Sequence, residues 1–195
     1  MRPIDVEVID DFVSPSYLKA LNKAVDPHRT QWHFQGSQSA IKYNKDNLED
    51  FGFAISLCSE KQPDVFSNTP LSAFISPLAY QMQDYIEASS IIRCRLDLTL
   101  FHRPKYRHLP HIDIHDSYRI PKYVAAIIYI NDTDGDTVIY DHKQEWAESY
   151  PTNMKIKKTI APKPGRLLLF DGSYVHTGHS PSEHQTRILL NTILS

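Results

Sequence analysis

The second half of the chain has the two-residue alternation of apolar and polar side chains that is typical of β-strands. Between residues 91 and 100 the apolar set is Ile92, Cys94, Leu96, Leu98 and Leu100, and the polar set is Arg93, Arg95, Asp97 and Thr99. This period predicts a strand with one apolar face. Further strands are predicted at residues 123–130, 137–140, 154–161, 166–170 and 187–194. Turn signals at Asp134-Gly135, Pro164-Gly165 and Asp171-Gly172 separate several of them, and so many short strands indicate a sandwich or a jelly roll.

The first half of the chain has a different, partly helical pattern. Residues 14–25 begin with a Ser-Pro pair suited to a helix N-terminus, and their apolar residues follow at helical spacing. Residues 71–88 repeat this character, with one apolar stripe made of Leu78, Met82, Tyr85 and Ile86. Both helices are expected to brace a sheet. The polar segment 44–68 shows neither period and is predicted to be loop or irregular structure.

Length and composition agree with one globular domain. The 195 residues suit a single domain, with residues 1–90 as a helical or mixed N-terminal layer and residues 91–195 as the β core. A net charge of -2 provides no global basic field, which argues against nucleic acid as a partner. Two cysteines without a disulfide pattern, and acids where a signal peptide needs an apolar core, are typical of a cytoplasmic protein. The longest apolar run, residues 124–130, is too short to span a membrane, and no feature indicates an oligomeric state.

The triplet His111-Ile112-Asp113 follows the first long predicted strand and is the sharpest chemical signal in the sequence. Residues i and i+2 of an extended segment project to the same side, so an imidazole and a carboxylate can converge there on one ion. His176, which follows a predicted strand and turn, is the best candidate for a third ligand. Two histidines and one carboxylate on one face of iron(II) leave three coordination positions open. An isolated HxD triplet often arises by chance, and the alternative is a surface histidine beside an acid.

Arg187 stands eleven residues after His176, at the start of an apolar predicted strand. An arginine buried in a strand is costly unless it meets an anion. A dicarboxylate bound to the metal through one end would present such an anion at its other end. The alternative is an edge-strand arginine paired with a surface acid.

As an ordered set, these motifs resemble those of the 2-oxoglutarate- and iron(II)-dependent dioxygenases, above all the branch of prolyl 4-hydroxylases and their microbial or phage-encoded relatives. The segments that carry the resemblance are HID at 111–113, YIND at 129–132, GDTVIYD at 135–141, APKPGRLLLFD at 161–171, His176 and Arg187. The resemblance covers roughly residues 91–194, and the opening VEVIDDFVSPSYLKAL is also similar to that branch.

The resemblance implies a mainly β fold with N-terminal helices, built around a double-stranded β-helix of the cupin-like, jelly-roll type. It implies that His111, Asp113 and His176 bind Fe(II), and that Arg187 binds the distal carboxylate of the cosubstrate 2-oxoglutarate. O2 is the oxidant, and ascorbate is a further candidate cofactor. Such an enzyme hydroxylates a C–H bond of a small-molecule or peptide substrate, with a prolyl residue or a proline-like molecule as the leading candidate.

The chain departs from that branch where tyrosines often face the cosubstrate. Phe101 or His102 stands near one such place, and Ile128 stands near another. Tyr129 and Thr99 are the residues that could substitute for the missing tyrosines.

Other functions are compatible with parts of this pattern. A cupin-type metalloprotein without 2-oxoglutarate would have no need of Arg187, and an inactive binding module would not need an intact His-Asp-His set. Halogenation on the same scaffold requires a small residue in place of Asp113. Nucleic-acid demethylases of this superfamily carry a second arginine at the position that Ile193 occupies here. Hydroxylation is therefore the leading interpretation.

The remaining histidines near these motifs are interpreted as surface residues rather than ligands. They are His102, His108, His115, His179 and His184. The connecting segments 102–122 and 141–153 are long enough to act as lids over a pocket.

Overall fold

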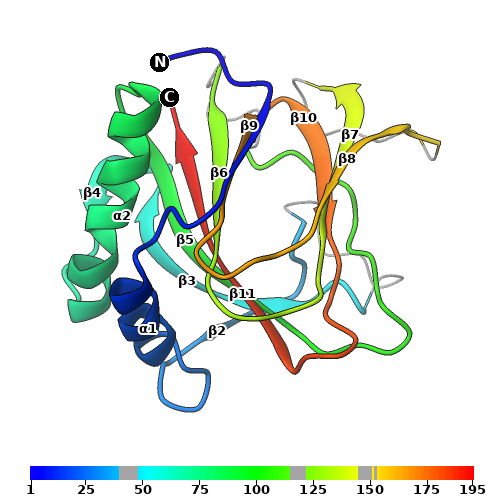
Figure 1. The fold of residues 1–195 in the computed structure, drawn as a ribbon, viewed down its shortest axis with the longest axis horizontal. Coiled ribbons are helices and arrows are strands. Elements are labelled where there is room, and N and C mark those ends of the chain that lie inside the picture. The colour runs from blue at the N-terminus through cyan, green and yellow to red at the C-terminus, as the bar shows by residue number, and fades with distance from the viewer. Residues whose placement is uncertain (40–47, 115–121, 145–150, 152) are drawn as a thin grey trace.

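In the computed structural model the chain forms two β-sheets, which Figure 1 shows facing each other, with two helices on the outer face of the larger sheet. The structure describes residues 1–39, 48–114, 122–144, 151 and 153–195. The larger sheet contains β1 (Val6–Ile9), β2 (His33–Gln35), β3 (Gly52–Ser59), β4 (Gln62–Phe66), β5 (Ile91–Leu100), β6 (Val124–Tyr129), β9 (Leu167–Asp171) and β11 (Thr186–Leu194). The smaller sheet contains β7 (Thr137–Lys143), β8 (Ile156–Ile160) and β10 (Tyr174–Gly178).

The strand order places residues from distant parts of the chain next to one another. It is β1-β9-β6-β11-β5-β3-β2 in the larger sheet, with β4 paired to β3, and β10-β7-β8 in the smaller sheet. Every one of these pairings is antiparallel. The expected mainly β fold with N-terminal helices is confirmed.

Both predicted helices form, as α1 (Pro15–Ala24) and α2 (Pro70–Ile86). Thr69 caps the N-terminus of α2: its side-chain oxygen accepts a hydrogen bond from the amide of Ser72, and a proline occupies the first turn. The predicted apolar stripe of α2 is buried except at Tyr85, which is 40% exposed. Tyr85 lies at the border of the stripe, where its hydroxyl donates to Glu7. No helix of the described residues is both long and apolar enough to cross a membrane.

The central strands of the larger sheet are buried on both faces. On the outer face, Leu96 and Leu190 pack with Leu21 and Leu78 of the helices in one apolar cluster. On the inner face, a second cluster joins the two sheets, with members that include Ile127, Leu168, Leu189 and Ile139. Burial of one such side chain contributes about 1.5–3 kcal/mol, so these two clusters fix the spacing of the layers.

The polar face of β5 points into the space between the sheets rather than into solvent. Arg93, Asp97 and Thr99 on this face are all buried. The predicted alternation slips at Ile92, which packs in the inter-sheet cluster instead of beside Cys94. The register explains this, because Ile193 pairs with Arg93 and Leu194 pairs with Ile91, which leaves Ile92 as an extra residue in a bulge.

The prediction of irregular structure for residues 44–68 is wrong over the described part, which contains β3 and β4. β3 pairs with β5 from Phe53, opposite Leu98, to Cys58, opposite Cys94. A register shift between Ser56 and Cys58 breaks the alternation that would have identified this strand. β1, β2 and β10 were also not predicted, because short strands depend on partners far along the chain rather than on their own pattern.

Candidate active site

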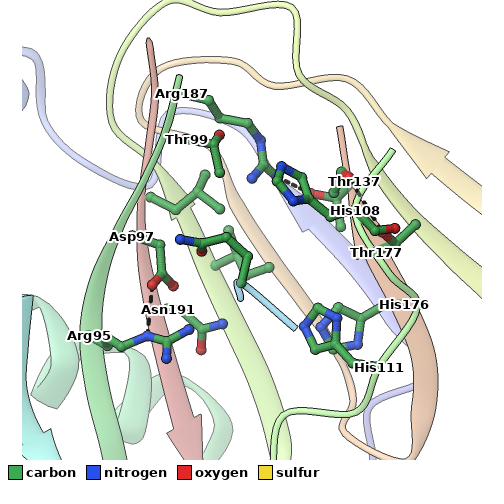
Figure 2. Close-up of a pocket in the computed structure, with 14 residues that line it drawn as sticks. Arg95, Asp97, Thr99, His108, His111, Thr137, His176, Thr177, Arg187 and Asn191 are labelled. Atoms are coloured by element: carbon green, nitrogen blue, oxygen red, sulfur yellow. Dashed lines mark hydrogen bonds and ion pairs between the residues drawn. The ribbon is translucent and has the colours of Figure 1, made fainter. Parts of the chain in front are cut away.

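The backbone holds His111 and His176 side by side, although 65 residues separate them along the chain. The amide of each residue donates a hydrogen bond of 2.9 Å to the carbonyl oxygen of the other. The two imidazole ring centroids are 4.5 Å apart, and Figure 2 shows both rings at one side of a pocket. His176 lies within β10, a strand that the sequence pattern did not reveal.

Asp113 joins these two histidines to form a group that could hold a metal ion. One nitrogen from each histidine and one carboxylate oxygen of Asp113 all lie within 4.8 Å of one another. Among the described residues, this is the one group of three or more His, Cys, Asp or Glu side chains with such spacing. The structure thus brings together the three residues that the sequence indicated.

The hydrogen bonds around this group leave the right atoms free for iron(II). The Nδ1 atom of His111 lies 3.0 Å from the carbonyl oxygen of Leu109, and that of His176 lies 3.2 Å from the carbonyl oxygen of Tyr174. An Nδ1–H that donates to a carbonyl leaves the Nε2 lone pair available to a metal. The Oδ2 atom of Asp113 is buried without a hydrogen bond among the described residues and faces Nε2 of His176 at 3.3 Å. This donor set fits an iron(II) ion with open positions.

Asp113 is held in place from behind by two polar residues of the larger sheet. Arg93 donates to the Oδ1 atom of Asp113 and, at 2.9 Å, to its carbonyl oxygen, while Asn191 donates to Oδ1 at 3.2 Å. Burial by itself raises the pKa of the Asp113 carboxyl, but Arg93 and His176 together keep that pKa well below its ordinary value. Asp113 is therefore an anion, as a metal ligand must be.

Arg93 is a residue of this site that the sequence interpretation missed. It is buried in β5, and a further ion pair joins its Nη1 atom to Glu60 at 3.2 Å. The available signal was the one used for Arg187, namely an arginine within an apolar strand. The alternation predicted one apolar face for this strand and did not indicate what its polar face contacts.

Burial also keeps His111 in the protonation state that metal binding needs. Its pKa is lowered to about 4, first by burial and then by the nearby His176. The imidazole is consequently neutral at neutral pH.

Arg187 is buried in a central strand, so the alternative of an edge-strand residue is wrong. Its Nε atom donates to the carbonyl oxygen of Gly135 at 2.7 Å, and its Nη2 atom donates to Oγ1 of Thr137 at 2.9 Å. Burial lowers the pKa of Arg187, and Tyr129 opposes this change. A guanidinium nevertheless stays charged, and no carboxylate among the described residues pairs with it.

Two glycines make room for the Arg187 side chain. A Cβ atom on Gly135 would lie 2.5 Å from Cδ of Arg187, and one on Gly178 would lie 3.1 Å from its Nη1 atom. Larger residues at either position would displace the guanidinium. The two glycines thus leave space for Arg187, whose guanidinium has no anionic partner among the described residues.

Arg187 and the two histidines line the same pocket, which encloses about 470 Å³ measured out to its open mouth. Thr99 lines it as well, and its hydroxyl is buried without a hydrogen-bond partner among the described residues. Of the two residues expected to replace the missing tyrosines, Thr99 is therefore in place. Tyr129 is fully buried, and its hydroxyl donates to Thr137 instead.

The other residues discussed for the cosubstrate contacts lie away from this pocket. Phe101 is 49% exposed, and Ile128 belongs to the apolar cluster beneath the helices. His102 lies within hydrogen-bonding distance, 2.7 Å, of the carbonyl oxygen of Pro104, in its own loop. His115 lies outside the described residues, as do parts of both segments predicted to act as lids.

The prediction that His108 is an exposed loop residue is wrong. It is buried at the pocket, with Nδ1 3.0 Å from Oδ1 of Asp50 and Nε2 3.0 Å from Oγ of Ser180. Of the other histidines expected at the surface, His179 and His184 are both partly buried. His184 faces Asp134 at 3.1 Å. No sequence signal pointed to His108, because its partners come from distant loops.

Asp50 is the centre of this buried network and is linked to the metal group. Its Oδ2 atom accepts a hydrogen bond from the Ser39 hydroxyl at 2.8 Å, and its Oδ1 atom accepts one from the amide of Leu109 at 3.1 Å. The carbonyl oxygen of Leu109 is the group that orients the ring of His111. Asp50 thus holds the segment that carries the first metal-ligand candidate.

We expect Asp50→Asn to lower the free energy of unfolding by about 1.5–3 kcal/mol at neutral pH, since it removes hydrogen bonds to a buried charge. Hydrogen bonds hold the pKa of Asp50 well below its ordinary value despite burial, which raises it. The stability that the ionised group contributes is therefore present above the unfolded pKa of about 3.9 and is lost as the pH falls further. In urea unfolding, the difference in the free energy of unfolding between Asp50→Asn and the wild type should become smaller as the pH falls towards ~3.

The control for this experiment is Asp84→Asn on the exposed face of α2, which should change stability little at any pH. An equal effect of the two substitutions would contradict the structural role given to Asp50.

Comparisons with known proteins agree with this geometry. The model of the 2OG-Fe(II) oxygenase superfamily matches residues 98–195. No curated protein sequence matches the chain. The fold is similar to that of a 2OG-Fe(II) oxygenase family oxidoreductase from Burkholderia pseudomallei, with a TM-score of 0.66, 13% identity, and coverage of 97% of this chain and 85% of that one.

Two structures of prolyl hydroxylases are also similar in fold. One is a prolyl-4-hydroxylase from Pseudomonas putida, with a TM-score of 0.62, 11% identity, and coverage of 98% of this chain and 93% of that one. The other is a prolyl hydroxylase from Trichoplax adhaerens in complex with a hypoxia inducible factor peptide, with a TM-score of 0.64, 14% identity, and coverage of 97% and 82%. At these identities the likeness concerns the fold.

Two facing sheets with a His-Asp-His group between them define the jelly-roll class of metal-dependent oxygenases. The chain belongs to the 2OG-Fe(II) oxygenase superfamily. It is therefore an iron(II)- and 2-oxoglutarate-dependent enzyme that uses O2, as the motifs implied.

Proposed function

We propose that this enzyme hydroxylates a C–H bond of a prolyl residue or a proline-like substrate. In this proposal His111, Asp113 and His176 hold the iron(II) ion, and Arg187 binds the distal carboxylate of 2-oxoglutarate. The observation that carries it is a pocket lined by both histidines of the His-Asp-His group and by an arginine that has no acidic partner among the described residues. Prolyl hydroxylases among the proteins of similar fold support the choice of substrate class.

The chain's own residues position the reactants and exclude water. The imidazoles of His111 and His176 and the anionic Asp113 offer three donor atoms on one side of the site. Arg187 is held by hydrogen bonds to Gly135 and Thr137 and lines the pocket, and its Nη1 atom donates to no described residue. When bound, iron(II) and 2-oxoglutarate together supply the oxidising power for attack on a C–H bond. The protein contributes binding, orientation and a shielded environment.

Hydroxylation is favoured over the other reactions considered for this scaffold. Asp113 occupies the position that a halogenase would leave to a small residue, and Arg93 and Asn191 keep its carboxylate pointed at the histidines. A metal-only cupin or an inactive module would have no use for the arrangement around Arg187.

The substrate class can be tested by mass spectrometry. After incubation with iron(II), ascorbate, 2-oxoglutarate and air, we expect a proline-containing peptide or free L-proline to gain the mass of one oxygen atom. His176→Ala should abolish this gain, and boiled enzyme is the second control. If 2-oxoglutarate is consumed but neither peptides nor proline gain oxygen, the enzyme acts on another substrate class.

A further inference from the structure

A second arginine lines the pocket, and the proposed function does not use it. Arg95 in β5 places its Nε atom 2.7 Å from Oδ1 of Asp97, and its side chain is 25% exposed. Asp97 is buried beside it. Figure 2 shows this pair on the side of the pocket that faces His111 and His176.

The guanidinium fork of Arg95 has no partner among the described residues. Asp97 is its single ion-pair partner there and meets only the Nε atom. Arg93, two residues earlier on the same face, differs because its Nη atoms are occupied by Asp113 and Glu60. A guanidinium presents two parallel N–H groups that match a carboxylate. Asp97 therefore orients Arg95 so that an open carboxylate-binding fork remains at the pocket.

Arg95 is too far from Arg187 for both to bind the same end of 2-oxoglutarate. In the register of β5 and β11, Thr99 lies opposite Arg187 and Arg95 lies opposite Asn191. The two levels are four residues apart, or about 13 Å along the strands at roughly 3.3 Å per residue. Asn191 contacts Asp113, so Arg95 is at the level of the metal group. The carboxylate of 2-oxoglutarate at this level would be bound to the iron(II) ion, so we assign the anion that Arg95 meets to a second molecule.

A cation can be accommodated beside this fork. The Oδ1 atom of Asp97 is buried without a hydrogen bond to the described residues, although it faces Nε of Arg95 at 2.7 Å, and no described residue donates to Oδ2. The hydroxyl of Thr99 on the same face is also unpartnered within the described part of the chain. A carboxylate-binding fork, a free carboxylate oxygen and a free hydroxyl on one face match a molecule that carries a carboxylate and an amine on the same carbon atom.

We propose, building on the function proposed above, that the substrate is a free α-amino acid whose carboxylate binds Arg95 and whose amine binds Asp97. L-Proline belongs to this class. An internal prolyl residue of a peptide does not, because its carboxyl group is tied up in a peptide bond. Arg95 is a substrate-binding residue in this scheme, and Asp97 positions it.

The test is calorimetry under nitrogen on protein loaded with iron(II) and 2-oxoglutarate. The probes are L-proline and the other proteinogenic amino acids, each compared with its amide and with its N-acetyl derivative. We expect at least one free amino acid to bind, and its amide and N-acetyl forms to bind at least about tenfold more weakly, as for a lost hydrogen bond between charged groups. The same amino acid should accelerate succinate release in air.

The matched variants are Arg95→Gln, Arg95→Lys and Arg29→Gln, the last at a largely exposed arginine. Arg95→Gln should weaken amino-acid binding at least about tenfold, while Arg95→Lys retains part of it and Arg29→Gln retains all of it. The double variant Arg95→Gln/Asp97→Asn replaces the ion pair by two neutral side chains. It leaves no buried charge without a partner, so it serves as the control for misfolding. Affinity for 2-oxoglutarate is measured on every variant, to show that each is folded.

Several results would overturn this assignment. They are binding of no free amino acid by the wild type, amides binding as well as acids, and loss of 2-oxoglutarate rather than amino-acid affinity in Arg95→Gln. Failure of the wild type to bind iron(II) and 2-oxoglutarate would instead overturn the proposed function itself. The two failures are therefore distinguishable.

Discussion

Replacing Arg187 by alanine is expected to weaken 2-oxoglutarate binding by roughly 30-fold to several thousand-fold. Truncation of one partner in a buried charge pair costs about 2–5 kcal/mol, and about 1.4 kcal/mol corresponds to a tenfold change. The effect should be large because Arg187 is buried and held by Gly135 and Thr137. Calorimetry under nitrogen measures the affinity, and succinate release in air measures turnover.

Arg187→Lys separates the charge from the geometry. An ammonium keeps the positive charge but cannot form the two parallel hydrogen bonds of a guanidinium, so this variant should fall between the wild type and Arg187→Ala. Iron(II) affinity should survive in both variants, since Arg187 is not among the metal-ligand candidates. If Arg187→Ala binds 2-oxoglutarate as tightly as the wild type does, the cosubstrate is held elsewhere.

Replacement of any of the three metal-ligand candidates is expected to remove most iron(II) affinity and all detectable turnover. Loss of an outer-shell partner alone typically costs about 10- to 100-fold in metal affinity or activity, so loss of a direct ligand should exceed about 100-fold. His111→Ala and His176→Ala are the cleanest variants. For the third position Asp113→Asn is preferable to alanine, because it leaves Arg93 and Asn191 a hydrogen-bond acceptor.

The matched control is His33→Ala, which removes an exposed imidazole on β2. It should bind one iron(II) per chain with the wild-type affinity. Iron titration under nitrogen, with circular dichroism to verify folding, gives the comparison. Retention of wild-type affinity in His176→Ala would show that the third ligand is a different residue.

The local chemistry of the site could be predicted from the sequence wherever neighbouring residues carry it. His111 and Asp113 share one side of an extended segment because of their i, i+2 spacing. Arg187 was recognisable because a charge within an apolar strand requires a partner. The helices and the strands from Ile91 onwards, except β10, were predictable because each has a periodic or continuous apolar pattern of its own.

The tertiary structure alone decided which residues support these groups. His176 meets His111 through a two-residue bridge between segments 65 residues apart, and neither segment has a pattern that specifies the pairing. His108 looked like a loop histidine, but Asp50 and Ser180 bury it, and each comes from another part of the chain. Strand β3 escaped prediction because a bulge breaks its alternation, and pairing with β5 stabilises it regardless.

The polar face of β5 shows most clearly where the sequence stops being informative. Its alternation determined that Arg93, Arg95, Asp97 and Thr99 share one side of a strand. Whether that side meets water or a second sheet depends on what packs against it, and packing is a property of the whole chain. The smaller sheet covers this face. A buried charge must find a partner in the protein or in a ligand. Arg93 therefore supports the metal-ligand candidate Asp113, and Arg95 presents its guanidinium to the pocket.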